Sequence, residues 1–175
     1  MITRIITFIA ISFLTCQLAL SEDKNRTLSF EYKGDIKVYL SITPFQKNDH
    51  EIKGGKDKNS CLLIDNKPFF GSDFQIPKYQ FQKFTVVVNG KPINLDVSGM
   101  YDPWNVYEGK DYMTENNIKI LPYFKDAYLV RGQFSDGAGS YFSEWLIIGN
   151  GSIRTILSNS ENIYNFYHDT FGKME

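Results

Sequence analysis

The chain has 175 residues, of which 42% are hydrophobic and 15% aromatic, and its formal net charge at pH 7 is −1. This length suits one domain with a sizeable core and is short for two domains that each have a core of their own. The near-neutral charge provides no basic surface that would attract nucleic acid or an anionic membrane. The sequence therefore indicates a single domain and argues against a nucleic-acid-binding protein.

The first 21 residues have the pattern of a secretory signal peptide. Arg4 precedes an almost wholly apolar run, Ile5 to Leu20, and the small residues Ala19 and Ser21 come just before a charged stretch. The apolar run is shorter than the roughly 20 residues that span a bilayer, so we expect cleavage and not a membrane anchor. The mature protein would be a secreted or periplasmic domain of residues 22–175, without a transmembrane segment.

The two cysteines fit this interpretation. Cys16 lies within the apolar run, and lipid anchoring through it is a secondary alternative, because Thr15 is not the small residue usually found before a lipidated cysteine. Cleavage would leave Cys61 alone, which excludes an internal disulfide and indicates a buried strand thiol. Of the 19 basic residues only Arg4 lies in the signal, which contains no acidic residue, so cleavage changes the net charge from −1 to −2.

Strand-like alternation dominates the first half of the domain. Apolar residues alternate from Leu28 to Tyr32 and again from Ile36 to Ile42, which predicts an antiparallel hairpin. The polar, glycine-containing stretch from Gln46 to Ser60 is interpreted as a long mobile loop. Asn89-Gly90 separates two alternating runs and predicts a type I′ turn, with Val86 facing Ile93.

A three-strand meander is predicted from Ala127 to Leu157. Its first connection, Asp136-Gly137-Ala138-Gly139, lacks the lysine and the spacing of a phosphate-binding loop. It also joins two antiparallel strands and does not open a helix. We interpret this segment as a turn, in which Phe134 faces Tyr141.

The meander also predicts a group of charged residues. The first turn places Arg131 directly opposite Glu144. If the second turn is a three-residue loop, with Ile148 facing Ser152, then Arg154 lies diagonal to Glu144 on the same face. We prefer to read these three residues as an ion triad that sets the sheet register. The alternative is a polar site for a ligand carboxylate or for a charged side chain of a partner.

The period changes to that of a helix near the C-terminus. Ser158-Asn159-Ser160-Glu161 has the spacing of a capping box, and apolar residues recur at helical spacing from Ile163 to Phe171. The predicted fold class is therefore mainly β. We expect an antiparallel meander or hairpin sheet, or a small barrel, with one amphipathic C-terminal helix packed on it.

Catalytic and metal-binding signals are weak. The two histidines, His50 and His168, lie in neither a nucleophile-elbow nor a zinc-helix pattern. The cluster Asn48-Asp49-His50-Glu51 has no second anchor for a metal. We therefore predict no enzyme activity, no metal and no cofactor, and we keep a hydrolase that uses Glu144 or His168 as the least favoured alternative.

The aromatic loop around Asp102-Pro103 carries the main functional signal. Tyr101, Trp104 and Tyr107 do not alternate, so they form either a buried plug or an exposed recognition surface. Our leading hypothesis is an exported binding protein that occupies a protein partner, as an inhibitor or immunity protein does. It would use this loop and the loop from Asn48 to Lys58.

The alternative hypothesis is a small-ligand or glycan binder. In that case the sheet would close around a cavity lined by aromatic residues, with Arg131 or Arg154 pointing inward.

Overall fold

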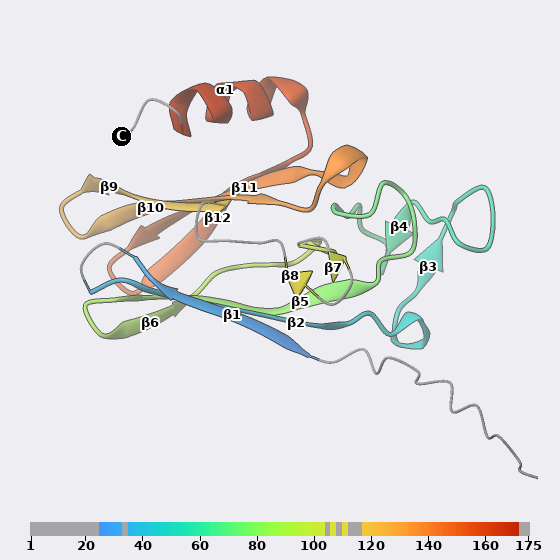
Figure 1. The fold of residues 1–175 in the computed structure, drawn as a ribbon, viewed down its shortest axis with the longest axis horizontal. Coiled ribbons are helices and arrows are strands. Elements are labelled where there is room, and N and C mark those ends of the chain that lie inside the picture. The colour runs from blue at the N-terminus through green and yellow to red at the C-terminus, as the bar shows by residue number, and fades with distance from the viewer. Residues whose placement is uncertain (1–24, 33–34, 104–105, 108–109, 112–116, 172–175) are drawn as a thin grey trace, which may run out of the picture.

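The computed structural model describes residues 25–32, 35–103, 106–107, 110–111 and 117–171, with side chains described except at 106–107, 110–111 and 168–171. The predicted signal peptide, including Cys16, lies outside these residues. Two four-stranded antiparallel sheets dominate the structure, with strand orders β1-β2-β5-β6 and β12-β11-β10-β9. Figure 1 shows the two sheets stacked on each other, with α1 on the outer side of the second sheet.

The two predicted hairpins lie in the first sheet and the predicted meander lies in the second. The first sheet consists of β1 (Arg26–Glu31), β2 (Lys37–Pro44), β5 (Tyr79–Val88) and β6 (Lys91–Asn94). The second sheet consists of β9 (Ile118–Phe124), β10 (Ala127–Phe134), β11 (Tyr141–Ile148) and β12 (Gly151–Ser158). The mainly β, antiparallel fold class with one helix near the C-terminus is therefore confirmed. The described strands form separate sheets and not one closed sheet.

The predicted registers hold in most hairpins. Val86 pairs with Ile93 across the Asn89-Gly90 turn, where both turn residues have positive φ angles of 50° and 74°. Asp136 to Gly139 is a turn, as expected, and Phe134 pairs with Tyr141 across it. Alternation and turn chemistry fixed these pairings locally.

The turn between β11 and β12 differs from the prediction by one residue. Ile148 pairs with Gly151, and not with Ser152, so the connection is a two-residue loop. The register shifts again between Glu144 and Trp145, where Thr155 forms the extra residue of a bulge in β12. A shift of one residue moves a side chain to the other face of a sheet.

The core lies between the two sheets and is aromatic. Phe84 of the first sheet meets Trp145 of the second with ring centroids 5.1 Å apart and planes at 75°, an edge-to-face arrangement. Phe134 contacts Phe81 in the same way at 5.6 Å. The Trp145 indole donates to the carbonyl of Asp96 at 2.8 Å, so its polar atom is satisfied inside the core.

A small lobe extends from one end of the sandwich (Figure 1). It contains β3 (Ile52–Lys53) paired with β4 (Leu63–Ile64), and a 3-10 turn at Lys47–Asp49. The stretch predicted as a long loop therefore carries regular structure, because its partner strand comes from farther along the chain. Cys61 is buried as predicted, but it lies just before β4 and not within a strand.

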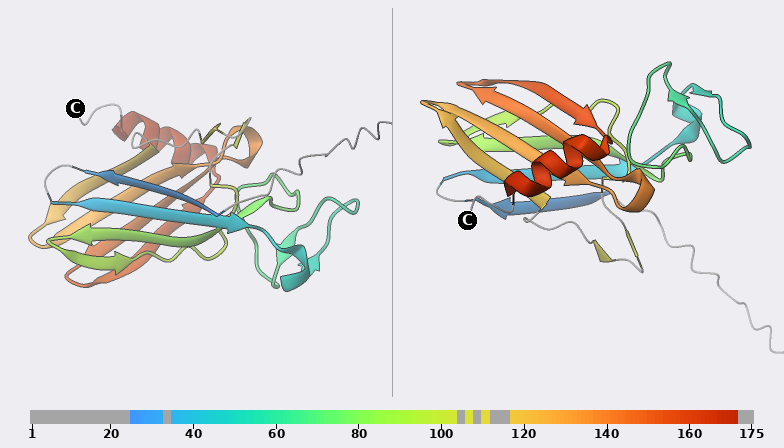
Figure 2. Two further views of the ribbon diagram at one scale, coloured as in Figure 1. Left: turned by 60° about the horizontal axis from the view of Figure 1, so that its bottom comes forward. Right: turned by 90° about the horizontal axis from the view of Figure 1, so that it is seen from above.

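The helix α1 (Glu161–Phe171) crosses the outer face of the second sheet at one end (Figure 2). It begins two residues later than the capping-box pattern suggested, because Ser160 and not Ser158 directly precedes the helix, and the Ser160 carbonyl accepts the amide of Tyr164 at 2.9 Å. The Ser158 hydroxyl instead accepts the amide of Ser160 at 3.0 Å. Among the described residues, no helix is long and apolar enough to cross a membrane. A short ribbon of β7 (Val106–Tyr107) and β8 (Lys110–Asp111) completes the described elements.

Candidate functional site

Of the three predicted aromatic site residues, the structure describes the side chain of Tyr101 alone. This ring is half-buried and meets Phe45 and Phe69 edge-to-face, with centroids 5.6 and 5.7 Å away. Burial raises the pKa of the Tyr101 hydroxyl. Trp104 lies outside the described residues, as does the side chain of Tyr107. Tyr101 is thus packed against neighbouring rings, and a recognition role for the rest of the loop stays a prediction.

Asp102 anchors this loop to the first sheet. Its carboxylate accepts the backbone amides of Tyr79 at 2.7 Å and Lys78 at 3.0 Å. The residue has a positive φ of 38°, a conformation that Asp tolerates better than most residues. Burial raises the pKa of Asp102 to about 6, although these amide hydrogen bonds act in the opposite direction.

Arg131 and Glu144 form a buried cluster under α1. Arg131 Nε donates to Glu144 Oε2 at 2.6 Å, and the two side chains are only 13% and 11% exposed. The Tyr167 hydroxyl of α1 donates to the same oxygen at 3.1 Å, and the Arg131 guanidinium lies over the Tyr167 ring at 4.8 Å. Thr155 Oγ1 donates to Glu144 Oε1 at 2.8 Å. The predicted pairing of Arg131 with Glu144 is confirmed.

Arg154 does not join this cluster, contrary to the predicted triad. The two-residue turn places it opposite Trp145, on the inner face of the sheet. There it donates to the Ser98 carbonyl at 2.6 Å and pairs with Asp96 Oδ2 at 3.2 Å. Arg154 therefore ties the two halves of the sandwich together, and Tyr167 and Thr155 take the places next to Glu144 that the prediction gave to Arg154.

Among the candidates for catalysis, the structure describes the side chains of Glu144, under α1, and His50, beside Phe45, and these two lie in separate places. Both Glu144 oxygens accept hydrogen bonds from neighbouring side chains. The side chain of His168 lies outside the described residues. His50 stacks on Phe45, with Nδ1 2.7 Å from Asp65 Oδ2 and Nε2 3.1 Å from Gln80 Oε1. The described residues contain no group of three His, Cys, Asp or Glu side chains that could hold a metal.

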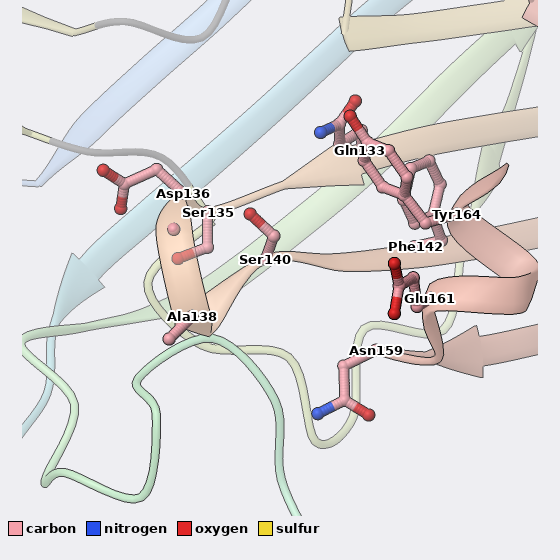
Figure 3. Close-up of a pocket in the computed structure, with 10 residues that line it drawn as sticks. Gln133, Ser135, Asp136, Ala138, Ser140, Phe142, Asn159, Glu161 and Tyr164 are labelled. Carbon is pink, nitrogen blue, oxygen red and sulfur yellow. The ribbon is translucent and has the colours of Figure 1, made fainter. Parts of the chain in front are cut away.

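A pocket of about 630 Å³ opens between the β10–β11 turn and the start of α1. Figure 3 shows Ser135, Asp136 and Ala138 of the turn on one side and Phe142, Tyr164 and the helix start on the other. Arg131 and Arg154 are absent from its described lining, and it lies outside the space between the sheets. The pocket therefore differs from the cavity within the sheet, lined by aromatic residues and an inward arginine, that was expected for a small-ligand or glycan binder.

An aliphatic row crosses the outer face of the second sheet beyond the helix. Leu121 pairs with Leu129, Leu129 with Leu146, and Leu146 with Ile153, so one row spans all four strands. Ile153 is 63% exposed, and Ile148 on the same face is 54% exposed. Figure 2 shows that α1 leaves this half of the sheet uncovered. We call Leu121, Leu129, Leu146 and Ile153 the aliphatic row.

The aliphatic row was not among the sites predicted from the sequence, although the sequence carries a signal for it. The residues on either side of Leu129 and of Leu146 in the sequence are also apolar. Because neighbouring residues of a strand point to opposite faces, β10 and β11 are apolar on both faces at these positions. In a sheet with one face in water, apolar and polar residues would alternate along these strands. The lack of alternation indicated a second apolar face, but not whether α1 would cover it.

Comparisons with protein-family models, with curated proteins and with solved structures gave no significant match to this chain.

Proposed function

We propose that this chain is a non-enzymatic binding protein that engages a protein partner through the uncovered half of its second sheet. The observation that carries the proposal is the aliphatic row together with exposed Ile148. Contiguous exposed apolar surface on a soluble domain marks interaction sites, because burying it against a partner is favourable.

Exposed aromatic residues next to the row enlarge its apolar surface. Tyr123 and Phe124, 55% and 59% exposed, extend the apolar area at the β9–β10 turn. Aromatic residues of this kind are enriched at interfaces, because they supply large contact area. A sheet face is a broad pleated surface, so the partner should present an apolar surface of matching flatness.

The border of the row is more basic than acidic. Lys119 shares the outer face with Leu121, two residues away on β9. The β9–β10 turn adds Lys125 and Asp126. A partner with carboxylates around its apolar centre would match this border, whereas a second copy of the chain would bring the same lysines. We therefore favour a different protein with an acidic border.

A matched pair of substitutions tests the proposal. Ile153→Asp places a charge in the row, and Leu62→Asp places the same charge at a residue 53% exposed on the β3–β4 lobe. We expect a partner isolated on the wild-type protein and then purified to bind Leu62→Asp normally, and Ile153→Asp at least about tenfold more weakly. This factor corresponds to about 1.4 kcal/mol.

Three other results would overturn this assignment. Equal binding by both variants would remove the row from the interface. A wild-type dimer in sedimentation that Ile153→Asp dissociates would make the face a contact between copies. Loss of binding in Trp104→Ala with full binding by Ile153→Asp would instead favour the aromatic loop predicted from the sequence.

A further inference from the structure

We propose that the pocket between the β10–β11 turn and α1 binds a small neutral saccharide, a mono- or disaccharide. This goes beyond the protein-binding function, because the pocket lies at the helix-covered end of the sheet (Figure 3). Its volume of about 630 Å³ falls within the range of about 300–1,000 Å³ that is typical of small-molecule sites.

The polar groups of the pocket both donate and accept hydrogen bonds. Each hydroxyl of a sugar is both a donor and an acceptor, so a matching site needs both kinds of group in number. Amides and hydroxyls provide both, and carboxylates accept. The pocket is lined by two amides, three hydroxyls and two carboxylates, from Gln133 and Asn159, from Ser135, Ser140 and Tyr164, and from Asp136 and Glu161. Of these, the Ser135 hydroxyl donates to the Gly71 carbonyl, so toward a ligand it can only accept.

The Tyr164 ring, 36% exposed, provides the apolar surface of the site, and the buried Phe142 ring supports it from below. Phe142 and Tyr164 both line the pocket, and their ring centroids lie 5.3 Å apart with planes at 74°. A pyranose has a face of C–H groups that is apolar and rigid, and this face packs well on an aromatic ring. Rings together with hydrogen-bonding groups suit a ligand that is polar at its edge and apolar on its face.

The turn that forms one wall is held in place from behind. The Ser135 amide donates to the Pro103 carbonyl at 2.8 Å, and its hydroxyl donates to the Gly71 carbonyl at 2.8 Å. Gly139 packs so closely that an added Cβ would lie 2.6 Å from that same carbonyl oxygen. A wall fixed in this way is formed before the ligand arrives, which lowers the entropic cost of binding.

The charges of the lining argue for a neutral ligand. No Lys, Arg or His is among the described residues that line the pocket, so this lining offers an anion no cationic side chain to pair with. An alkylammonium ion would suit Asp136 and Glu161, but it has no acceptor for the amide N–H groups of Gln133 and Asn159. A neutral polyhydroxyl compound can accept from the amide N–H groups and donate to the carboxylate of Glu161.

Binding to an array of neutral mono- and disaccharides, followed by calorimetry with the sugar that is retained, tests this inference. We expect Gln133→Ala and Glu161→Gln each to weaken that sugar about three- to tenfold, the loss typical of one hydrogen bond. Tyr164→Phe keeps the ring and should weaken binding by a similar or smaller factor. Gln82→Ala is the control, because Gln82 is exposed on β5 of the other sheet, and should leave binding unchanged.

Three outcomes would contradict the saccharide proposal. Retention of no sugar on the array would overturn the proposal, and so would a sugar that binds Gln133→Ala and Glu161→Gln as tightly as it binds the wild type. Binding of tetramethylammonium that Glu161→Gln abolishes, without binding of any sugar, would assign the pocket to a cation instead.

Discussion

Replacement of Glu144 by glutamine should destabilise the fold through the cluster under α1. The substitution keeps the shape of the side chain and one acceptor oxygen, but it removes the counter-charge of Arg131. The two side chains are 11% and 13% exposed, so water screens their interaction little. Arg131 would be left as a largely buried cation without a charged partner.

The magnitude follows from this burial. Breaking a buried ion pair by removing one partner costs about 3–5 kcal/mol, and the retained amide oxygen favours the lower end. In a domain of this size each kcal/mol shifts the melting temperature by about 2–4 °C. We therefore expect Glu144→Gln to lower the melting temperature by about 6–12 °C. Glu31→Gln is the control, since Glu31 and Lys37 pair at 2.9 Å but are 73% and 48% exposed, and it should change nothing measurable.

Thermal unfolding followed by circular dichroism measures both variants, and a double-mutant cycle with Tyr167→Phe shows whether α1 is part of the cluster. Tyr167 donates to Glu144 Oε2 at 3.1 Å, so its hydroxyl should matter less once the charge is removed. We expect a coupling of about 1 kcal/mol. A loss of less than about 2 °C in Glu144→Gln, or strict additivity in the cycle, would refute the reasoning.

Two further predictions concern the loop around Asp102. Burial raises the pKa of Asp102 to about 6 from 3.8, so the folded protein binds this proton more tightly than the unfolded chain does. Stability should therefore fall by up to about 3 kcal/mol as the pH rises from about 4 to 6. Urea unfolding of Asp102→Asn should show a flatter pH profile, and an equally steep one would contradict this assignment. Gly71 has a φ of +121°, and an added Cβ would lie 1.9 Å from the Tyr101 carbonyl oxygen. Gly71→Ala should thus cost more than about 2 kcal/mol, whereas Gly90→Ala, at φ +74° with nothing within 4 Å, should cost about 1 kcal/mol. Equal losses of melting temperature in the two variants would argue against this contact.

Local rules were sufficient for most of the fold. The Asn89-Gly90 turn and the alternation around it set the pairing of Val86 with Ile93, since turn type and burial of one face allow a single register. The same reasoning placed Arg131 opposite Glu144. Prediction failed where one residue more or less in a turn was equally compatible with the sequence, as at Ile148, and where Thr155 formed a bulge.

The candidate sites depend on tertiary contacts that no local pattern encodes. Arg154 lies on the opposite face from the predicted one because the β11–β12 turn has two residues, and there it pairs with Asp96, which is far from it in the sequence. Ile52 pairs with Ile64 across a connection whose sequence is that of a polar loop. The pocket exists because α1 starts beside the β10–β11 turn, and the helical period of the C-terminal segment gives the helix but not its position.

The position of α1 links the cluster, the pocket and the aliphatic row. Successive rows on the outer face of the second sheet pair Gln133 with Phe142, then Arg131 with Glu144, then Leu129 with Leu146. Tyr164 of α1 packs on Phe142 in the first row, and Tyr167 on Arg131 and Glu144 in the second. The polar second row gives the helix a specific partner at a fixed place, whereas aliphatic side chains alone would hold it without a fixed register. The contacts of Tyr167 with the Arg131–Glu144 pair hold α1 over this end of the sheet, so the helix start forms the pocket wall there, and the aliphatic row lies at the uncovered end.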